Sequence, residues 1–312
     1  MSGRPRTPWP DGKKFAFTIF DDTDKATVAN VGPVYSFLHE LGMRTTKSVW
    51  PVSGPGTPRV AGATCDDEGY ASWTVALQRR GFEIGYHGAS NVTAPRSLTR
   101  RALDRFQSLY GHPPTAMANH ADCREGMYWG SSRVSGVNRV IYNALTRFRN
   151  VDRYRGHVDG DELFWGDLCR ASIRYVRNFT FSSINTLAAC PQMPYHDPDR
   201  PYVNAWFAAS EGRDVAAFNR LVSEANQDRL EAQGGACVIY THLASGFFEN
   251  GHLDSDFERL MRRLATKNGW YVPVSTLLDH LALGRESLVI DRAQRSSLER
   301  RWLRSKIMIG SS

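Results

Sequence analysis

The chain has 312 residues, of which 41% are hydrophobic and 23% are charged, and its formal net charge at pH 7 is +7. This composition is typical of a globular protein and excludes global disorder. No apolar run approaches the roughly 20 residues that a membrane span requires, and the length suits one large domain or two small ones.

The first residues and the cysteines bear on the cellular compartment. Residues 1–8 contain no apolar segment, so we expect no secretory signal peptide and a cytoplasmic protein. The cysteines are odd in number, widely spaced and never arranged as C-x-x-C, which disfavours a disulfide framework and a structural zinc cluster. We expect reduced and mostly buried thiols at Cys65, Cys123, Cys169, Cys190 and Cys237.

Strand-like and helix-like patterns alternate through the first half of the chain. Stretches rich in aromatic and β-branched residues predict strands at residues 14–20, 45–52, 82–87 and 115–120. Apolar residues at helical spacing predict helices at residues 28–41, 72–80, 97–110 and 129–148. This order is typical of a parallel sheet with helical crossovers.

The second half resumes the alternation after a less regular segment at residues 151–201. The proline-rich loop that ends this segment is interpreted as a functional lid. Strands are predicted at residues 202–208, 236–242 and 270–274, and helices at residues 214–233 and 254–268. We therefore predict an α/β fold whose parallel sheet is either open or closed into a barrel.

Acidic and imidazole side chains follow several of the predicted strands. Both architectures place their chemistry at the carboxyl ends of the strands, where this sequence has Asp21, Asp22, His87, His120 and His242. One carboxylate and two imidazoles form an open hydrolytic site for a divalent cation. Such a cation polarises a carbonyl group and lowers the pKa of a bound water. A free carboxylate can then act as general base, and a further histidine can protonate the leaving group.

Three segments, FTIFDDTD, GFEIGYHGASN and VIYTHLA, occur in this order along the chain. Together they resemble the motifs of the polysaccharide deacetylase (NodB-homology) superfamily, of which the chain looks like a divergent member over residues 15–283. The resemblance implies a distorted (β/α) barrel and metal-assisted removal of N- or O-acetyl groups from glycans. It also implies that Asp21 is the general base, that Asp22 and His87 bind the metal, and that His242 is the general acid. The implied cofactor is a divalent metal, zinc first, with cobalt, manganese or nickel as alternatives.

The sequence departs from the family pattern at several positions. The glycine of the first motif is Thr23, and an additional acid, Asp24, follows it. In the second motif Gly88 replaces serine or threonine and Asn91 replaces the second histidine. The Arg-x-Pro-Tyr motif is not evident, and His120 stands in its approximate place. Three alternatives therefore stay open. The third metal ligand is His120; or it is Asn91, which binds directly or through water; or the site holds no functional metal.

Further side chains are candidates for contact with a substrate. Tyr195 and Trp206 can stack on sugar rings through their apolar faces. Arg177 can stabilise an oxyanion or bind a carboxylate or phosphate, and His196 and Asn91 are polar candidates in loops. All of these residue types also occur as ordinary structural residues, so the two interpretations stay open.

The C-terminal segment differs from the rest in charge. Residues 285–312 carry seven basic and three acidic residues, so four of the seven net positive charges lie there. We predict a barrel domain over residues 1–284 and a basic helical tail over residues 285–312. The helix either contacts an anionic membrane surface peripherally or packs Leu298, Trp302 and Ile309 on the domain with its arginines in solvent. Nucleic acid is not expected as a partner, because no recognition motif accompanies the charge.

The sequence therefore favours a cytoplasmic metal-dependent hydrolase that removes an acyl group, N-acetyl first, from a sugar or glycan precursor. The loss of the second motif histidine motivates an alternative, a catalytically silent barrel that binds a glycan or a protein. A metal-dependent hydrolase of other C–N bonds is a third interpretation. The sequence does not indicate an oligomeric state.

Overall fold

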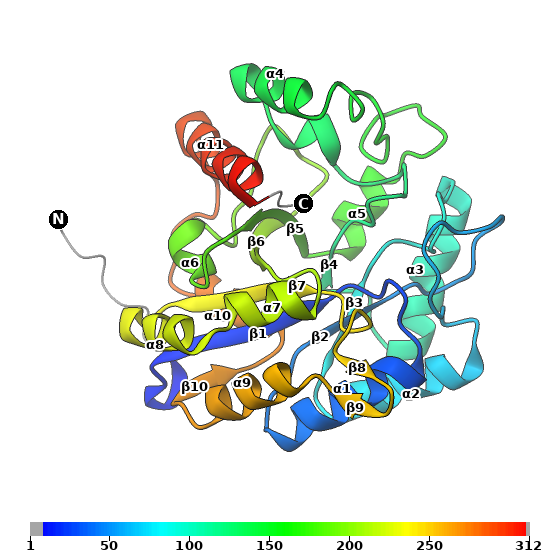
Figure 1. Cartoon of the computed structure of the whole chain (residues 1–312). Helices are drawn as coiled ribbons and strands as arrows, with labels where there is room; N and C mark the ends of the chain where they lie inside the picture. Colours follow the sequence, from blue (N-terminus) through cyan, green and yellow to red (C-terminus); the bar gives the residue numbers. More distant parts are fainter. Residues whose placement is uncertain (1–8, 310–312) are drawn as a thin grey trace.

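Parallel strands close into a barrel in the computed structural model, which describes residues 9–309 (Figure 1). The barrel closes where β1 pairs with β7, from Ala16 opposite Ala236 to Asp21 opposite Thr241. Its seven strands, in chain and spatial order, are β1 (Phe15–Asp21), β2 (Thr46–Val49), β3 (Glu83–Tyr86), β4 (Ala116–Met117), β5 (Tyr175–Phe181), β6 (Ala205–Glu211) and β7 (Ala236–Thr241).

The barrel is distorted beside β1. On the edge of β1 that faces β2, only Phe20 and Asp21 pair with that strand. The first half of this edge pairs instead with a late strand, β10 (Gly269–Tyr271), starting at Phe15 opposite Gly269. A small antiparallel pair, β8 (Phe248–Glu249) and β9 (His252–Leu253), lies outside the barrel sheet.

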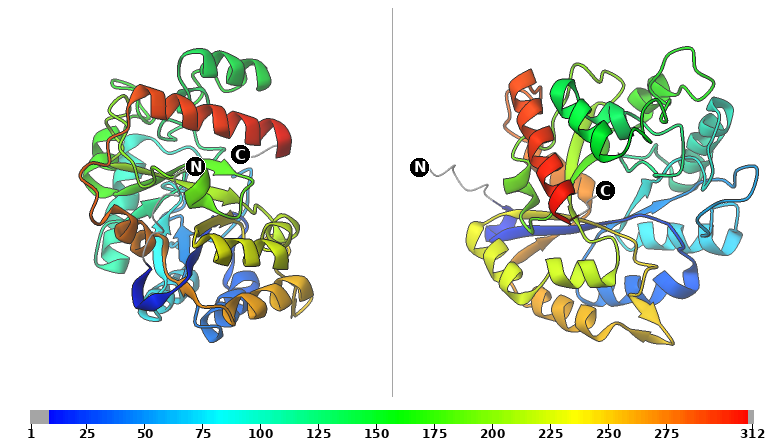
Figure 2. Two further views of the ribbon diagram at one scale, coloured as in Figure 1. Left: turned by 90° about the vertical axis from the view of Figure 1, so that its left-hand side faces the viewer. Right: turned by 45° about the horizontal axis from the view of Figure 1, so that its top comes forward.

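Helices surround the strands (Figures 1 and 2). Their starts follow local signals: Thr27 and Asn30 form a capping box at the first helix, and Asp67, Asp214 and Asp254 cap later ones. The longer helices of the barrel are α1 (Val28–Glu40), α2 (Glu68–Arg79), α3 (Arg96–Tyr110), α4 (Gly136–Leu145), α8 (Glu224–Gln233), α9 (Ser255–Ala265) and α10 (Val274–Ala282). Shorter elements are η1 (Pro10–Gly12), η2 (Gly130–Arg133), α5 (Gly166–Ser172), α6 (Thr186–Ala189) and α7 (Val215–Leu221).

The predicted alternation of strands and helices is confirmed, but several elements differ. The helix expected at residues 129–148 is a short 3-10 helix, Gly130–Arg133, followed by an α-helix over Gly136–Leu145. The helix expected at residues 214–233 is two helices, because the chain leaves the helical conformation between Leu221 and Glu224. The irregular segment at residues 151–201 contains β5, a strand whose residues are all buried. A strand covered on both faces has no alternating pattern, and β5 also carries the polar residues Arg177 and Asn178 at its centre.

The C-terminal helix α11 (Arg292–Ile309) packs against β5 and α4. Trp302 is fully buried, with its ring centroid 5.5 Å from that of Tyr142 and 5.2 Å from that of Phe179. Leu298 is buried beside it, whereas the side chain of Ile309 lies outside the described residues. The apolar face of the tail thus packs on the barrel, and a domain boundary at residue 284 stays a prediction.

Residues 1–8 and 310–312 lie outside the described part of the chain. The prediction that the N-terminal segment is not a signal peptide concerns residues 1–8 and therefore lies outside it too. Within residues 9–309, the helices are all too short or too polar to cross a bilayer. The five cysteines are buried, and each carries a free thiol.

Candidate active site

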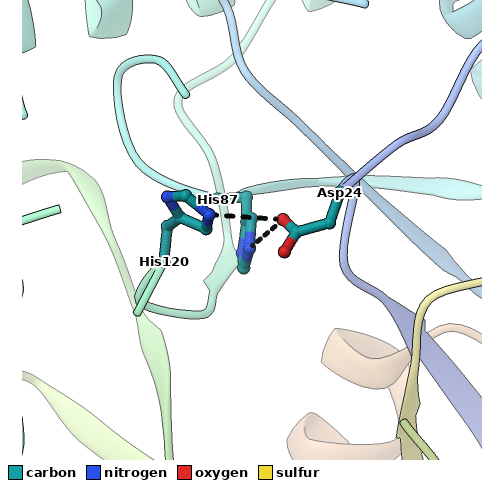
Figure 3. A group of neighbouring side chains, drawn as sticks. All are labelled: Asp24, His87 and His120. Carbon is teal, nitrogen blue, oxygen red and sulfur yellow. Dashed lines mark ion pairs between the residues drawn. The ribbon is translucent and has the colours of Figure 1, made fainter. Parts of the chain in front are cut away.

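Three side chains converge at the carboxyl end of the barrel (Figure 3). One carboxylate oxygen, Oδ1 of Asp24, lies 3.2 Å from His87 Nε2 and 3.6 Å from His120 Nε2. These donor atoms all lie within 4.8 Å of one another. Both imidazoles are buried, and they come from the ends of the neighbouring strands β3 and β4.

The turn after β1 is fixed by contacts to distant parts of the chain. The hydroxyl groups of Thr23 and Tyr70 lie 2.8 Å apart in a buried hydrogen bond. Lys25 has a φ of 60° and donates its backbone N–H to the carbonyl of Ala61. These contacts flank Asp24 on both sides and direct its carboxylate toward the histidines.

A tryptophan packs behind the histidines. The ring of Trp50 lies 6.0 Å from His87 and 5.4 Å from His120, and its indole N–H donates to the carbonyl of His87. The residue after His87 has a φ of 91°, in the left-handed region that favours glycine. Gly88 thus has a structural reason to replace the serine or threonine of the family motif.

A fourth group approaches the same carboxylate. His242, directly after β7, places Nε2 3.5 Å from Oδ2 of Asp24, and its Nδ1 lies 2.7 Å from the carbonyl oxygen of Arg213. With the proton on Nδ1, this contact is a hydrogen bond that directs Nε2 into the site. Burial lowers the pKa of His242, but the carboxylates of Asp24 and Asp22 outweigh it and raise the pKa to about 9.

Asp22 lies at the edge of this cluster and is held by an arginine. Arg177, from β5, donates two parallel hydrogen bonds of 2.7 and 2.6 Å to its carboxylate. One carboxylate oxygen also lies 3.8 Å from His87 Nδ1. Burial raises the pKa of Asp22, but the Arg177 guanidinium and His87 together hold it below its ordinary value. Asp22 is therefore an oriented carboxylate beside the histidines.

Asp21 belongs to a separate buried network. Its Oδ2 forms an ion pair of 3.0 Å with Lys47 Nζ and accepts a hydrogen bond from the Tyr35 hydroxyl. Its Oδ1 accepts from the backbone N–H of Leu243. The side chains of Asp21 and Lys47 are both fully buried, so the adjacent acids Asp21 and Asp22 have different partners.

The remaining predicted residues lie in other contacts. Asn91 is half-buried in the loop after His87, and its side chain makes no hydrogen bond or ion pair within residues 9–309. Tyr195 and Trp206 are buried and joined by backbone hydrogen bonds. His196 Nδ1 contacts the carbonyl oxygens of Val203 and Asn204. The structure thus brings together His87, His120, His242, Asp22 and Arg177. Within residues 9–309, no side-chain hydrogen bond, ion pair or ring contact joins this cluster to Asn91, Tyr195, His196 or Trp206.

Sequence reasoning noticed Asp24 only as an additional acid. Two other residues behind His120 were missed: Cys123, whose Sγ lies 3.1 Å from His120 Nδ1, and Glu125. Glu125 is 3% exposed, and its carboxylate oxygens have no hydrogen-bond partner in the described part of the chain. Burial raises the pKa of Glu125 to about 7. The only sequence signal for these residues was their proximity to His120.

The donor set fits a divalent metal. A carboxylate and two imidazoles are ligands that catalytic zinc sites use, with the fourth position left for water or substrate. Asp24 Oδ1 is buried and accepts no hydrogen bond within residues 9–309, so its lone pairs remain for a cation. The neutral amide of Asn91 is not required to complete this set.

No family model and no curated protein matches the chain. Among solved structures it is similar to a protein assigned to the polysaccharide deacetylases from Mycobacterium smegmatis, with a TM-score of 0.50 and 13% identity over 93% of this chain and 98% of that one. It is similar to the allantoinase PuuE, with a TM-score of 0.53 and 11% identity over 91% and 95% of the two chains. A Pseudomonas aeruginosa protein assigned to the polysaccharide deacetylases gives a TM-score of 0.50 and 11% identity over 89% of this chain and 94% of that one. The chain therefore has the (β/α) barrel fold of the polysaccharide deacetylase type that the sequence resemblance predicted.

Proposed function

We propose that the protein is a metal-dependent hydrolase that removes an acyl group, N-acetyl first, from a sugar or glycan precursor. The convergence of Asp24, His87 and His120, with His242 opposite, is the observation that carries this proposal. The fold shared with polysaccharide deacetylases and an allantoinase supports hydrolysis of a C–N bond. The cytoplasmic location expected from the sequence stays a prediction.

In this proposal Asp24, His87 and His120 hold the metal, with zinc as the best match to the donor set. A bound zinc ion supplies Lewis acidity toward an acyl oxygen and lowers the pKa of water. Asp24 thus takes the role that the family motif gives to Asp22, and His120 takes that of the missing second histidine.

We assign proton transfer to two further residues. Asp22 is held by Arg177 beside His87, and each of its oxygens keeps a lone pair with which to accept a proton from the attacking water. His242 presents Nε2 to the same space and donates a proton to the departing amine. Arg177 is then a positioning residue, and Asp21, held by Lys47, is structural.

A hydrolase of other C–N bonds is the second candidate, favoured by the shared fold with an allantoinase. Both candidates are tested by incubating the zinc-loaded protein with N-acetylglucosamine oligomers and with allantoin. Release of acetate from the oligomers supports the first candidate, and conversion of allantoin to allantoate supports the second.

The matched control is Asp24→Ala, which removes one proposed ligand from a partly exposed position. Either activity must disappear in this variant. The alternative is a catalytically silent barrel that binds a glycan or a protein. It would be supported if the protein binds zinc but hydrolyses no acyl sugar, amide or ester.

A further inference from the structure

Large apolar side chains are exposed mainly on one part of the molecule. Of the eleven exposed large hydrophobic residues among those described, eight lie on α4, in the turns after it, or at the end of α11. Val137 is 76% exposed, Phe148 64% and Met308 78%. We call this region the α4–α11 surface, with apolar residues Val137, Val140, Ile141, Leu145, Phe148, Val151, Ile307 and Met308.

The exposed apolar residues of α4 share one side of that helix. Val137, Ile141 and Leu145 follow one another at intervals of four residues, which aligns them along a helix. The adjacent side of α4 packs on α11, because Tyr142 stacks on Trp302 and Asn138 donates to Glu299. Val137, Ile141 and Leu145 are 76%, 42% and 47% exposed, so this row of apolar side chains is open to solvent beside α11.

The same surface is strongly basic. Residues 131–151 contain four arginines and no acidic residue, and α11 contains five arginines and one lysine. The single acid of α11, Glu299, is buried and accepts hydrogen bonds from Ser135 and Asn138. Six exposed arginines form no ion pair with any described residue: Arg139, Arg147, Arg149, Arg292, Arg300 and Arg304.

A groove between α4 and α11 combines both properties. Its volume is about 810 Å³, and its lining includes apolar side chains next to guanidinium groups. A phosphate group fits the guanidinium groups, and a hydrocarbon segment fits the apolar side chains. The apolar side chains of the lining are Val137, Ile141, Leu303 and Ile307, and the guanidinium groups include those of Arg300 and Arg304.

We propose that the α4–α11 surface binds an anionic phospholipid membrane peripherally. A symmetric dimer through this surface would bring its arginines against those of the second copy. A nucleic acid would neutralise the arginines but leave the apolar side chains in water. An anionic bilayer surface accommodates both, because apolar residues enter the interface while basic residues attract the headgroups.

Vesicle flotation of the full chain tests this proposal without any turnover, so its outcome is independent of the proposed enzymatic activity. The protein should float with vesicles of phosphatidylcholine mixed with phosphatidylglycerol, and not with phosphatidylcholine alone. Added salt should weaken the binding because it screens the charges.

Two variants test the surface itself. Arg300→Glu with Arg304→Glu should reduce vesicle binding at least about tenfold, because each basic residue near an anionic surface contributes appreciably. Val140→Asp with Ile141→Asp should reduce it by a similar factor. Matched controls on other exposed sites, Arg100→Glu with Arg101→Glu and Leu283→Asp, should bind like the unaltered protein.

Thermal unfolding and sedimentation check that each variant is folded, which we expect because the substituted side chains are exposed. Absence of binding to anionic vesicles, or equal loss in the α3 control and the α11 variant, would overturn the proposal. So would a dimer that forms without vesicles and is abolished by the Val140→Asp, Ile141→Asp variant, because a second copy would then cover the surface.

Discussion

Arg177 holds Asp22 through two parallel hydrogen bonds of 2.7 and 2.6 Å, both groups being buried at the carboxyl end of the barrel. Asp21, the preceding residue, pairs with Lys47 instead, and Asp24 faces the histidines. Three acids within four residues thus have three different partners. The assignment of their roles rests on these contacts, and each role predicts a separate behaviour on substitution.

Asp21→Asn should destabilise the protein by about 3–5 kcal/mol, because it leaves the charge of buried Lys47 without its partner. The zinc content of the folded fraction should not change. Urea unfolding and metal analysis measure the two effects. Combining the change with Lys47→Met should restore part of the lost stability. The opposite result, a stable Asp21→Asn variant that has lost its activity, would identify Asp21 as the general base.

Asp22→Asn should retain zinc and lose hydrolysis by about 10²–10⁴-fold, the usual contribution of a general base. Steady-state kinetics on whichever proposed substrate the zinc-loaded protein hydrolyses measures the loss in kcat. Arg177→Lys keeps the charge but cannot form both hydrogen bonds, so it should lower kcat by a smaller factor. Unchanged activity in Asp22→Asn would rule out the proposed role.

His242→Ala should also keep the metal and lower kcat by about 10²–10⁴-fold for an acetylated amine. The loss should be much smaller for an aryl acetate, because a good leaving group departs without being protonated. His112→Ala, at an exposed position in a turn, is the control. An equal loss for both substrates would contradict a general acid and indicate a role in holding the site together.

Glu125 predicts a pH dependence of stability in the metal-free protein. Its pKa rises on folding from 4.5 to about 7, so the folded state binds the Glu125 proton more tightly than the unfolded state. The free energy of unfolding is therefore highest below pH 4.5 and falls as the pH rises through 7. Glu125→Gln, measured by urea unfolding with chelator present, should therefore gain up to about 3 kcal/mol at pH 8 relative to the parent and little at pH 4.5. A parallel pH profile for both proteins would show that Glu125 is ionised in the fold.

The sequence predicted the strands that precede the acids and histidines of the site, because buried parallel strands are recognisable locally. His87, His120 and His242 could be found from their positions after such strands. The carboxylate that faces these histidines could not be predicted. Asp22 and Asp24 are both plausible, and the choice between them depends on tertiary contacts of the turn that contains them. The hydrogen bond between Thr23 and Tyr70 joins residues 47 positions apart, and no local pattern reports it.

β5 was not predicted for a related reason. Its central residues Arg177 and Asn178 are polar yet buried, and they are acceptable there only because distant groups satisfy them. Arg177 meets Asp22, which lies 155 residues earlier in the chain. A strand that contributes a charged residue to a site thus loses the apolar signature by which it would be recognised.

The central claim, that Asp24 rather than Asp22 completes the metal site with His87 and His120, is tested most directly by metal content. The unaltered protein, Asp24→Ala and Asp22→Asn are loaded with zinc, dialysed, and analysed by mass spectrometry of the bound metal. The parent and Asp22→Asn should each keep about one equivalent, and Asp24→Ala should keep almost none. Retention by Asp24→Ala together with loss from Asp22→Asn would contradict the account and return the ligand role to Asp22.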